Sequence, residues 1–309
     1  MARWRTGRIG LLLLPLLLLG ACSGAQPLPP RPGPAPARTS VSTPTAKAAV
    51  SSGASTVQRD LTVGGVQRSY LAVGVSGKQG LPLVIVLHGR GVTAQQESVR
   101  TGFLTYADSG LADFVYPQGT YESWNDAHGC CGKAGASGID DLGFVTQLVG
   151  DATRFFGSNP KHVYLVGYSN GARLAFEEVC GNPSLFAAFA TYGALPPTSC
   201  PTGPPMRVLI GGGTNDTLMH SEGSVTTTLT RWRERDGCTS ASTTAHTGPL
   251  TMTTWAACRD RSAVVYAAYS GIGHHWPTVE PTPEPFTTPV GSEAAAATVM
   301  WDFLVSHSA

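Results

Sequence analysis

Short apolar runs alternate with amphipathic segments along most of this 309-residue chain. Residues 83–87 and 163–166 are continuous apolar runs, which are typical of strands buried on both faces of a sheet. Elsewhere apolar positions recur at helical spacing, most clearly over residues 142–156 and 172–179. Strands that alternate with helices predict a parallel sheet covered on both faces, with the functional loops at the carboxyl ends of the strands.

Turn and capping residues set the expected limits of these elements. Asp140 or Asp141 is expected to cap the helix that follows, and Gly181 with Pro183 is expected to stop the helix over residues 172–179. The other expected elements are strands at residues 114–116, 206–210 and 263–269, a hairpin around Gly64-Gly65 within residues 62–71, and a capped C-terminal helix over residues 292–307.

One strand leads directly into Gly167-Tyr168-Ser169-Asn170-Gly171, and a helical pattern follows. A G-x-S-x-G sequence in this position is a nucleophile elbow, whose tight turn exposes the serine hydroxyl above the sheet. The flanking glycines suit a strained turn that leaves no room for Cβ atoms. The order of strand, turn and helix therefore favours Ser169 as a nucleophile over a serine in an ordinary glycine-rich turn.

A serine hydroxyl needs a base within hydrogen-bond reach, and that base needs a third group to orient it. Ser169, Asp216 and His274 follow one another in the order nucleophile, acid and histidine that an α/β hydrolase requires. Each of the three comes just after a predicted strand. We therefore predict that these residues form a catalytic triad.

Other residues compete for two of these roles. The rival bases are His275, His220 and His246, and the glycine-rich approach at Gly273 favours His274 over them. The rival acids Asp140 and Asp141 precede Ser169 in the chain and suit helix capping better.

Backbone N–H groups are expected to hold the developing oxyanion. The elbow places the N–H of Asn170 at the start of a helix, where unpaired donors favour negative charge. The second donor is expected in the loop after residues 83–87, at the N–H of Arg90, with Gly91 as its neighbour. Trp124 and Trp276 are candidate aromatic residues of the substrate cleft, although tryptophans in such positions also belong to hydrophobic cores.

The N-terminus carries Arg3, Arg5 and Arg8 before a leucine-rich run that ends in Leu19-Gly20-Ala21-Cys22. A basic start and a short apolar core are typical of an export signal, because the core is too short to span a bilayer comfortably. The residues before Cys22 resemble the lipobox of bacterial lipoproteins, in which the cysteine is lipidated. We expect a lipoprotein signal peptide at residues 1–21 and a lipid on Cys22; an ordinary secretory signal is the alternative.

Residues 22–56 are rich in Pro, Ala, Ser and Thr and contain few large apolar side chains. Such a segment cannot bury enough surface to offset its ordering entropy, so it is expected to be a disordered tether between the lipid and a folded domain. Residues 57–309 are long enough for one hydrophobic core and are expected to form a single α/β-hydrolase domain.

Composition limits the partners. The formal net charge is +1 and charged residues make up 13% of the chain, so no basic face suggests a nucleic acid. Neutral or polymeric substrates fit better, and we expect a monomer.

Seven cysteines are present, and lipidation of Cys22 leaves an even set. Export makes disulfides plausible, and among the fifteen possible pairings Cys238 with Cys258 is the one to name first, because they bracket one compact segment. The cysteines lack C-x-x-C spacing and no histidine accompanies them in a zinc pattern, so no metal is expected. The other members of the set are Cys130, Cys131, Cys180 and Cys200.

Several segments together resemble a known family: Leu87-His88-Gly89, Tyr116-Pro117-Gln118-Gly119, Ser123-Trp124-Asn125, Cys130-Cys131-Gly132, Ile139 to Phe144, Gly167 to Gly171, and Gly273 to Pro277. They look like the polyhydroxybutyrate depolymerase-like esterases, which also include feruloyl and acetylxylan esterases. The resemblance implies an α/β-hydrolase fold and cofactor-independent ester hydrolysis by Ser169, Asp216 and His274. The chain departs from the family at Arg90-Gly91 and at Gly212-Gly213-Thr214, where many relatives show His-Gly-Thr.

The sequence thus predicts a surface-tethered serine esterase acting on a small-molecule or polymeric ester outside the cytoplasm. Two alternatives stay open at this point. One is a serine peptidase on the same fold, which shares the elbow, and the other is a non-catalytic lipoprotein that uses the fold as a binding module.

Overall fold

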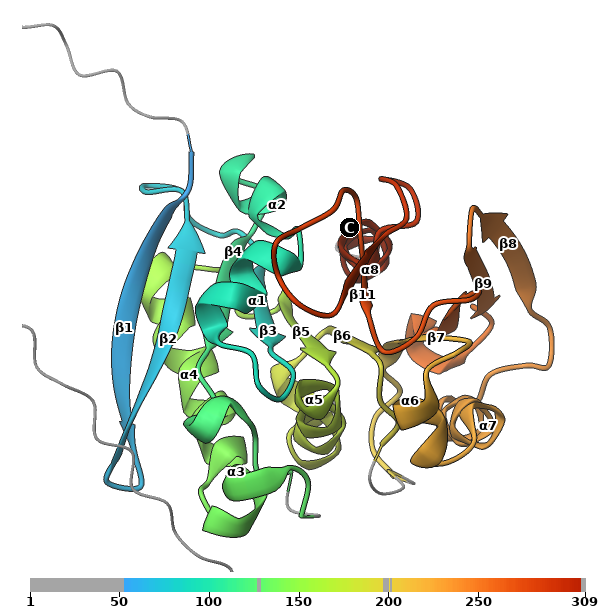
Figure 1. Cartoon of the computed structure of the whole chain (residues 1–309), viewed down its shortest axis with the longest axis horizontal. Helices are drawn as coiled ribbons and strands as arrows, with labels where there is room; N and C mark the ends of the chain where they lie inside the picture. The colour runs from blue at the N-terminus through green and yellow to red at the C-terminus, as the bar shows by residue number, and fades with distance from the viewer. Residues whose placement is uncertain (1–52, 127–128, 197–199, 201, 307–309) are drawn as a thin grey trace, which may run out of the picture. The chain divides into compact units, whose positions relative to one another are not determined.

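The computed structural model contains a ten-stranded sheet in the order β1-β2-β4-β3-β5-β6-β7-β10-β9-β8 (Figure 1). The structure describes residues 53–126, 129–196, 200 and 202–306. The strands are β1 (Ser55–Val63), β2 (Val66–Gly74), β3 (Leu83–Leu87), β4 (Asp113–Pro117), β5 (Val163–Tyr168), β6 (Ala188–Tyr192), β7 (Arg207–Gly213), β8 (Thr243–Thr247), β9 (Leu250–Trp255) and β10 (Val264–Tyr269). Two short strands, β11 (Trp276–Thr278) and β12 (Thr287–Pro289), pair separately.

The middle of the sheet is parallel, from β4 through β3, β5, β6 and β7 to β10. Every residue of β3 and β5 is buried, as the continuous apolar runs predict. Antiparallel hairpins extend both edges, with β1 and β2 on one side and β9 and β8 on the other. Parallel strands end at the same edge of a sheet, so the loops after β5, β7 and β10 can meet there.

Helices cover both faces of this sheet (Figure 1). One buried apolar cluster includes residues of α1 (Ala94–Arg100) and α8 (Ala296–Val305), and the segment around α2 (Leu104–Asp108) packs into it. A second cluster packs α4 (Asp141–Phe156), α5 (Asn170–Gly181) and α7 (Val225–Asp236) against the other face. The predicted α/β-hydrolase architecture of one domain is confirmed for the described residues.

The structure shows how two of the predicted helices, α4 and α8, begin. Asp140 caps α4, because its Oδ1 accepts from the N–H of Gly143 at 2.7 Å. Asp141 is buried and pairs instead with Arg68, at 2.6 Å between Oδ1 and Nη2. The predicted capped helix over residues 292–307 is wrong at its start: α8 begins at Ala296, and Ala295 at the cap position has no side-chain acceptor to offer.

The pattern missed the strand β6 and the β8–β9 hairpin. β6 has only five residues, two of them alanines, so its apolar run is weak in the sequence. β8 is a threonine-rich edge strand whose residues are almost all exposed, so no alternation marks it. Tertiary pairing with β10 through β9, rather than a local signal, places this hairpin.

The folded unit begins slightly earlier than predicted. β1 starts at Ser55, two residues before the expected domain start at residue 57. The predicted signal peptide (residues 1–21), the lipidation site Cys22 and most of the predicted tether (residues 22–56) lie outside the described residues. Within the described ranges, no helix combines the length and the apolarity that crossing a membrane requires.

Three disulfides form within the described residues. Cys238, two residues after the end of α7, pairs with Cys258 after β9, which confirms the pairing named first from the sequence. Cys180 in α5 pairs with Cys200, and the neighbours Cys130 and Cys131 pair with each other. The first two bridges each close a loop with a sequence separation of 20, so they restrict the unfolded chain around α5 and α7.

Candidate active site

Ser169 sits between β5 and α5 with φ of 53° and ψ of −120°, a backbone conformation that L-residues rarely adopt. A Cβ on Gly167 would lie 2.5 Å from the carbonyl oxygen of Gly171, and one on Gly171 would lie 2.4 Å from that of Leu87. Neither neighbour is a flexible side chain that could move away. The turn therefore requires glycine at both flanks, as the sequence predicts.

The strain at Ser169 has a measurable consequence. We expect Ser169→Gly to be more stable than Ser169→Ala by about 1 kcal/mol in free energy of unfolding, and so to unfold at a higher temperature. The reason is that glycine adopts a positive φ without a Cβ penalty. Thermal unfolding of the two variants, neither of which has a nucleophile, measures the difference. Equal stabilities would mean that the turn stores no strain at this residue.

His274 connects Ser169 to Asp216. Its Nε2 lies 2.7 Å from the Oγ of Ser169, and its Nδ1 lies 2.8 Å from the Oδ2 of Asp216. Asp216 is fully buried, and its other oxygen accepts from the N–H of Met219 at 2.9 Å, at the start of α6 (Thr217–Ser221). The carboxylate therefore has a fixed orientation, and the three side chains form one continuous chain of hydrogen bonds.

The rival residues lie elsewhere. His275 is exposed and contacts the hydroxyl of Thr288, and His246 contacts Thr251 in the edge hairpin. His220 lies in the last turn of α6 and is exposed. Among the residues that the structure describes, His274 is the histidine with a hydrogen bond to Ser169.

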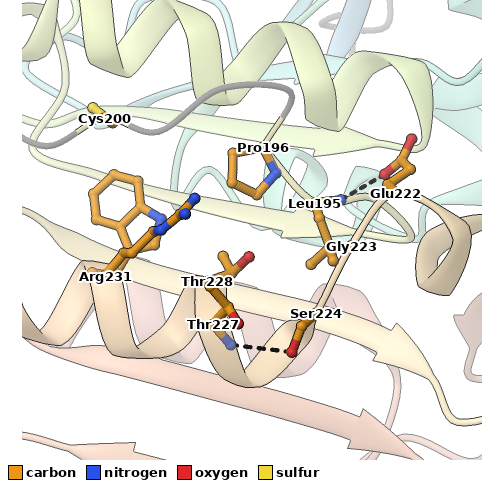
Figure 2. A pocket seen from close by; sticks show the side chains of 10 residues that line it. Leu195, Pro196, Cys200, Glu222, Gly223, Ser224, Thr227, Thr228 and Arg231 are labelled. Atoms are coloured by element: carbon orange, nitrogen blue, oxygen red, sulfur yellow. Dashed lines mark hydrogen bonds between the residues drawn. The ribbon is translucent and has the colours of Figure 1, made fainter.

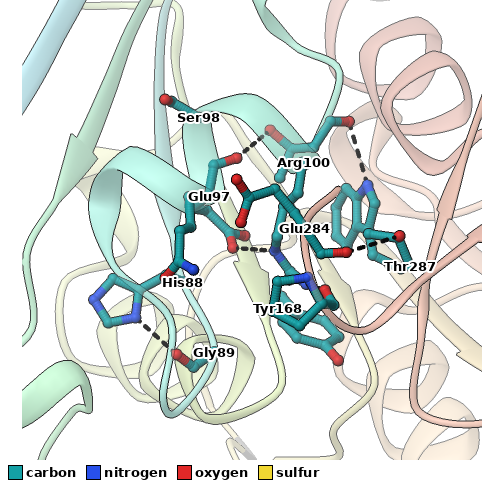
Figure 3. A network of polar contacts seen from close by, with 12 residues as sticks. His88, Gly89, Glu97, Ser98, Arg100, Tyr168, Glu284 and Thr287 are labelled. Atoms are coloured by element: carbon teal, nitrogen blue, oxygen red, sulfur yellow. Dashed lines mark hydrogen bonds and ion pairs between the residues drawn. The ribbon is translucent and has the colours of Figure 1, made fainter. Parts of the chain in front are cut away.

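A buried ion pair supports the residue before the nucleophile (Figure 3). Glu97 and Arg100 of α1 pair at 2.6 Å, and the guanidinium carbon lies 4.1 Å from the ring centroid of Tyr168. Arg100 also donates to the carbonyl oxygen of Pro285 at 3.3 Å. Burial raises the pKa of Tyr168, so its hydroxyl stays protonated and donates to the carbonyl oxygen of His274 at 2.8 Å. One side chain thus links the elbow to the histidine loop.

The two predicted oxyanion donors are free in the described part of the chain: the N–H groups of Arg90 and Asn170 have no hydrogen-bond acceptor there. Gly91, the alternative donor, gives its N–H to the carbonyl oxygen of Glu122 at 2.8 Å. Because its N–H is already bonded, Gly91 is not available as an oxyanion donor. Arg90 remains the candidate donor in the loop after β3.

The side chain of Asn170 fixes the position of the segment at Ser123 and Trp124, which borders the site. Its Oδ1 accepts from the hydroxyl of Ser123 at 2.9 Å and from the N–H of Trp124 at 2.7 Å. Trp124 in turn donates from Nε1 to the carbonyl oxygen of His88 at 2.8 Å. The loop after β3 and the loop after β4 are therefore fastened to the first residue of α5.

The prediction that Trp124 and Trp276 line the substrate cleft is wrong. Both side chains are 0% exposed. The indole of Trp276 donates to the carbonyl oxygen of Thr101 at 3.2 Å and packs against Tyr168 and Tyr192. Each tryptophan satisfies its single N–H inside the protein, so both belong to the packing that supports the site.

His88 is buried as a neutral imidazole. Its Nε2 accepts from the N–H of Gly119 at 2.9 Å, so Nδ1 carries the proton and donates to the carbonyl oxygen of Gly89 at 2.8 Å. Burial lowers the pKa of His88 to about 4, since protonation would add an unpaired charge and break the bond from Gly119.

We expect this histidine to make the fold less stable in acid. Because its folded pKa is below that of the unfolded chain, the unfolded state binds the extra proton, and the free energy of unfolding falls as the pH drops from about 6.5 toward 4. Urea unfolding across that range should show a smaller decrease for His88→Gln, which can still accept from Gly119. His246→Gln, at an exposed histidine, is the control; equal slopes for all three proteins would contradict the assignment.

A cavity of about 420 Å³ opens beside Ser169 and His274. Its apolar lining includes Leu218, Phe286 and the Cys130–Cys131 bridge. Leu218 and Phe286 are 60% and 48% exposed, so they lie at the mouth. In the described residues, no three His, Cys, Asp or Glu side chains are grouped so that they could hold a metal ion.

Charged side chains of the cavity were missed from the sequence. Arg173 donates from Nε to Asp126 and from Nη1 to Glu222, the second bond at 3.0 Å. Arg173 stands four residues after Ser169, so helical spacing could have placed it on the same face of α5. Glu222 follows α6 and carried no comparable signal.

Glu222 also lines a second cavity of about 240 Å³, between the segment after β6 and the start of α7 (Figure 2). Its Oε2 accepts from the N–H of Leu195 at 2.8 Å. The hydroxyl of Ser224 caps α7 by accepting from the N–H of Thr227 at 3.3 Å. The two cavities thus share one wall, and Glu222 is held in it by Arg173 and by Leu195.

Parts of this chain are similar in sequence to known proteins. Residues 67–199 match the family model described as Esterase PHB depolymerase. The protein NocK of Nocardia uniformis subsp. tsuyamanensis, whose name describes it as an esterase, is 32% identical over 219 residues, which cover 64% of this chain and 61% of NocK. The bifunctional acetylxylan esterase/xylanase XynS20E of Neocallimastix patriciarum is 25% identical over 207 residues, which cover 62% of this chain and 28% of that protein. The chain therefore spans less than two thirds of the length of either relative.

The structure is also similar to the acetyl xylan esterase from Aspergillus awamori, with a TM-score of 0.55 and 15% sequence identity. The match covers 71% of this chain and 94% of that one. At this identity the likeness shows the fold. The described chain has an α/β-hydrolase fold, and its residues 67–199 match the family model described as Esterase PHB depolymerase.

Proposed function

We propose that this protein is a serine ester hydrolase that works through an acyl-enzyme. The observation that carries the proposal is the chain of hydrogen bonds from Asp216 through His274 to Ser169, beside a cavity. The match to an esterase family over residues 67–199 supports the same chemistry. Since all three residues belong to one chain, a monomer contains the whole site.

In the first half of the reaction, the Oγ of Ser169 attacks the ester carbonyl while Nε2 of His274 takes the hydroxyl proton. The carbonyl oxygen becomes negative and accepts from the N–H groups of Asn170 and Arg90. The buried carboxylate of Asp216 stabilises the imidazolium and keeps its orientation. His274 then gives the proton to the leaving alcohol as the bond between carbonyl carbon and alcohol oxygen breaks.

In the second half, water replaces the alcohol. His274 takes a proton from the water, the hydroxide attacks the acyl-enzyme, and the proton returns to the Oγ of Ser169 when the acid leaves. The same two N–H groups hold the second oxyanion. The reaction needs no group beyond these residues and water.

We further propose that the enzyme is exported and held at a membrane by a lipid on Cys22. The basic residues, the leucine-rich run and Leu19-Gly20-Ala21-Cys22 support this. Expression in a bacterial host with a radiolabelled fatty acid should label the wild type and leave Cys22→Ala unlabelled. Labelling of both proteins would place the lipid elsewhere.

A fluorophosphonate probe tests the nucleophile, since it should modify Ser169 and the modified peptide can be identified by mass. A panel of p-nitrophenyl acyl esters, hydroxybutyrate oligomers, feruloyl esters and acetylated xylan then defines the ester, with a peptide anilide as the peptidase arm. Absence of labelling would support a non-catalytic binding protein, and faster cleavage of the anilide than of every ester would make the protein a peptidase.

A further inference from the structure

The guanidinium of Arg90 is a cation on the wall of the catalytic cavity. The other arginines around the site have carboxylate partners: Arg68 pairs with Asp141, Arg100 with Glu97, and Arg173 with Asp126 and Glu222. Arg90 forms no ion pair or hydrogen bond with any residue that the structure describes. Its positive charge is therefore available to bind an anionic group of a molecule inside the cavity.

The rest of the lining does not cancel this charge. Glu222 is the acidic residue in the lining, and its two oxygens are taken by Arg173 at 3.0 Å and by the N–H of Leu195 at 2.8 Å. The nearby walls are apolar, formed by the Cys130–Cys131 bridge, Leu218 and Phe286. Arg90 is an exposed residue, so its attraction for an anion is partly screened by water and weakens further as salt is added.

The side chain of Arg90 also has a defined position. Its Nη2, Cζ and Nε lie 3.6, 3.7 and 3.7 Å from the point where a Cβ on Gly132 would stand, so the guanidinium lies flat against the backbone beside Cys131. A planar guanidinium placed this way presents its N–H edge for bidentate contact with a carboxylate.

The chemistry of Ser169 and His274 indicates which part of the substrate meets this cation. The leaving alcohol must be within reach of Nε2 of His274, so it lies on the histidine side, where the ring of Phe286 is 6.4 Å from that of His275. The acyl chain leaves the carbonyl carbon in a different direction from the alcohol, and the lining that remains for it includes Arg90 and Cys131.

We propose that the acyl part of the preferred ester carries a carboxylate, bound by Arg90, so that the substrates are half-esters of dicarboxylic acids. This inference rests on the proposed ester hydrolysis and names its substrate class. Hydrolysis of such a half-ester releases the alcohol and a free dicarboxylate.

The test compares two pairs of esters on the full-length protein. In the first pair the acyl chain ends in a carboxylate or its methyl ester: mono-(4-nitrophenyl) glutarate and methyl 4-nitrophenyl glutarate. In the second pair the carboxylate is on the alcohol: 4-acetoxybenzoate and methyl 4-acetoxybenzoate. The readout is the ratio of kcat/KM for the anionic and neutral member of each pair, because the backbone N–H of Arg90 is itself proposed to contact the oxyanion.

We expect the wild type to prefer the anionic glutarate, and Arg90→Gln to lower that ratio about five- to tenfold, chiefly through KM. Arg90→Lys should restore part of the ratio, and the preference should weaken at high salt. Lys133→Gln is the matched control, since this exposed cation of α3 (Gly132–Ser137) lies 5.7 Å over the Tyr121 ring and does not line the cavity.

An unchanged glutarate ratio in Arg90→Gln, or an anion preference confined to the acetoxybenzoate pair, would overturn this proposal. In either case turnover of the neutral esters and labelling of Ser169 would leave the ester hydrolase intact. A loss of all turnover and labelling in the wild type would instead overturn the proposed function.

Discussion

Replacing Ser169 by alanine is expected to lower kcat for a p-nitrophenyl ester by about 10⁴- to 10⁶-fold, with KM changed little. The Oγ of Ser169 is the atom that forms the acyl-enzyme, and Nε2 of His274 has no other serine within hydrogen-bond distance among the described residues. Water can still use His274 and the two N–H donors, so a residual rate above that of buffer should remain.

A matched control separates this effect from damage to the fold. Ser270→Ala changes an exposed serine after β10, outside the cavity lining, and should keep the wild-type rate. Steady-state kinetics and circular dichroism on both variants make the comparison. Full activity in Ser169→Ala would remove Ser169 from the mechanism.

Replacing Asp216 by asparagine is expected to lower kcat by about 10³- to 10⁴-fold while the protein stays folded. An asparagine can still cap α6 through its oxygen, which would accept from Met219 as Oδ1 of Asp216 does at 2.9 Å. Its NH₂ group then faces Nδ1 of His274, which must become an acceptor. The proton moves to Nε2, the nitrogen that should take the proton of Ser169.

Asp140→Asn is the control for this variant. Asp140 caps α4 in the same manner that Asp216 caps α6, but it contacts no residue of the triad. Kinetics and thermal unfolding of the two variants should show a large rate loss in Asp216→Asn alone. If both variants kept their activity, Asp216 would be a helix cap and nothing more.

The parts of the site that could be predicted from the sequence are those set by strand ends. Ser169, Asp216 and His274 each follow an apolar run, and parallel pairing of β5, β7 and β10 within one sheet brings the ends of those runs to one edge. A pattern that predicts the strands therefore also predicts which loops meet. The need for glycine at both flanks of the elbow could also be predicted, because the G-x-S-x-G pattern after a strand is typical of one tight turn, the nucleophile elbow.

The parts that could not be predicted depend on how distant segments pack. Trp124 and Trp276 stand next to polar and glycine residues that look exposed in the sequence. Each indole N–H nevertheless donates to a carbonyl oxygen far along the chain, at His88 and Thr101. No local pattern reports such a partner. The same holds for Glu222, whose place in the cavity depends on contacts with Arg173 and Leu195.

Leu218 and Phe286 show how the protein could diverge without losing its chemistry. Apart from the bonds of helix α6, the hydrogen bonds of both residues within the described ranges use only their backbone carbonyl oxygens, which accept from the hydroxyl of Ser221 and from the N–H of Trp276. Their side chains can therefore be exchanged without breaking a side-chain hydrogen bond among the described residues, although the φ of 58° at Phe286 disfavours β-branched residues there. Selection for a new ester could act first on these two positions, and a library randomised there would sample substrate ranges at little risk to folding.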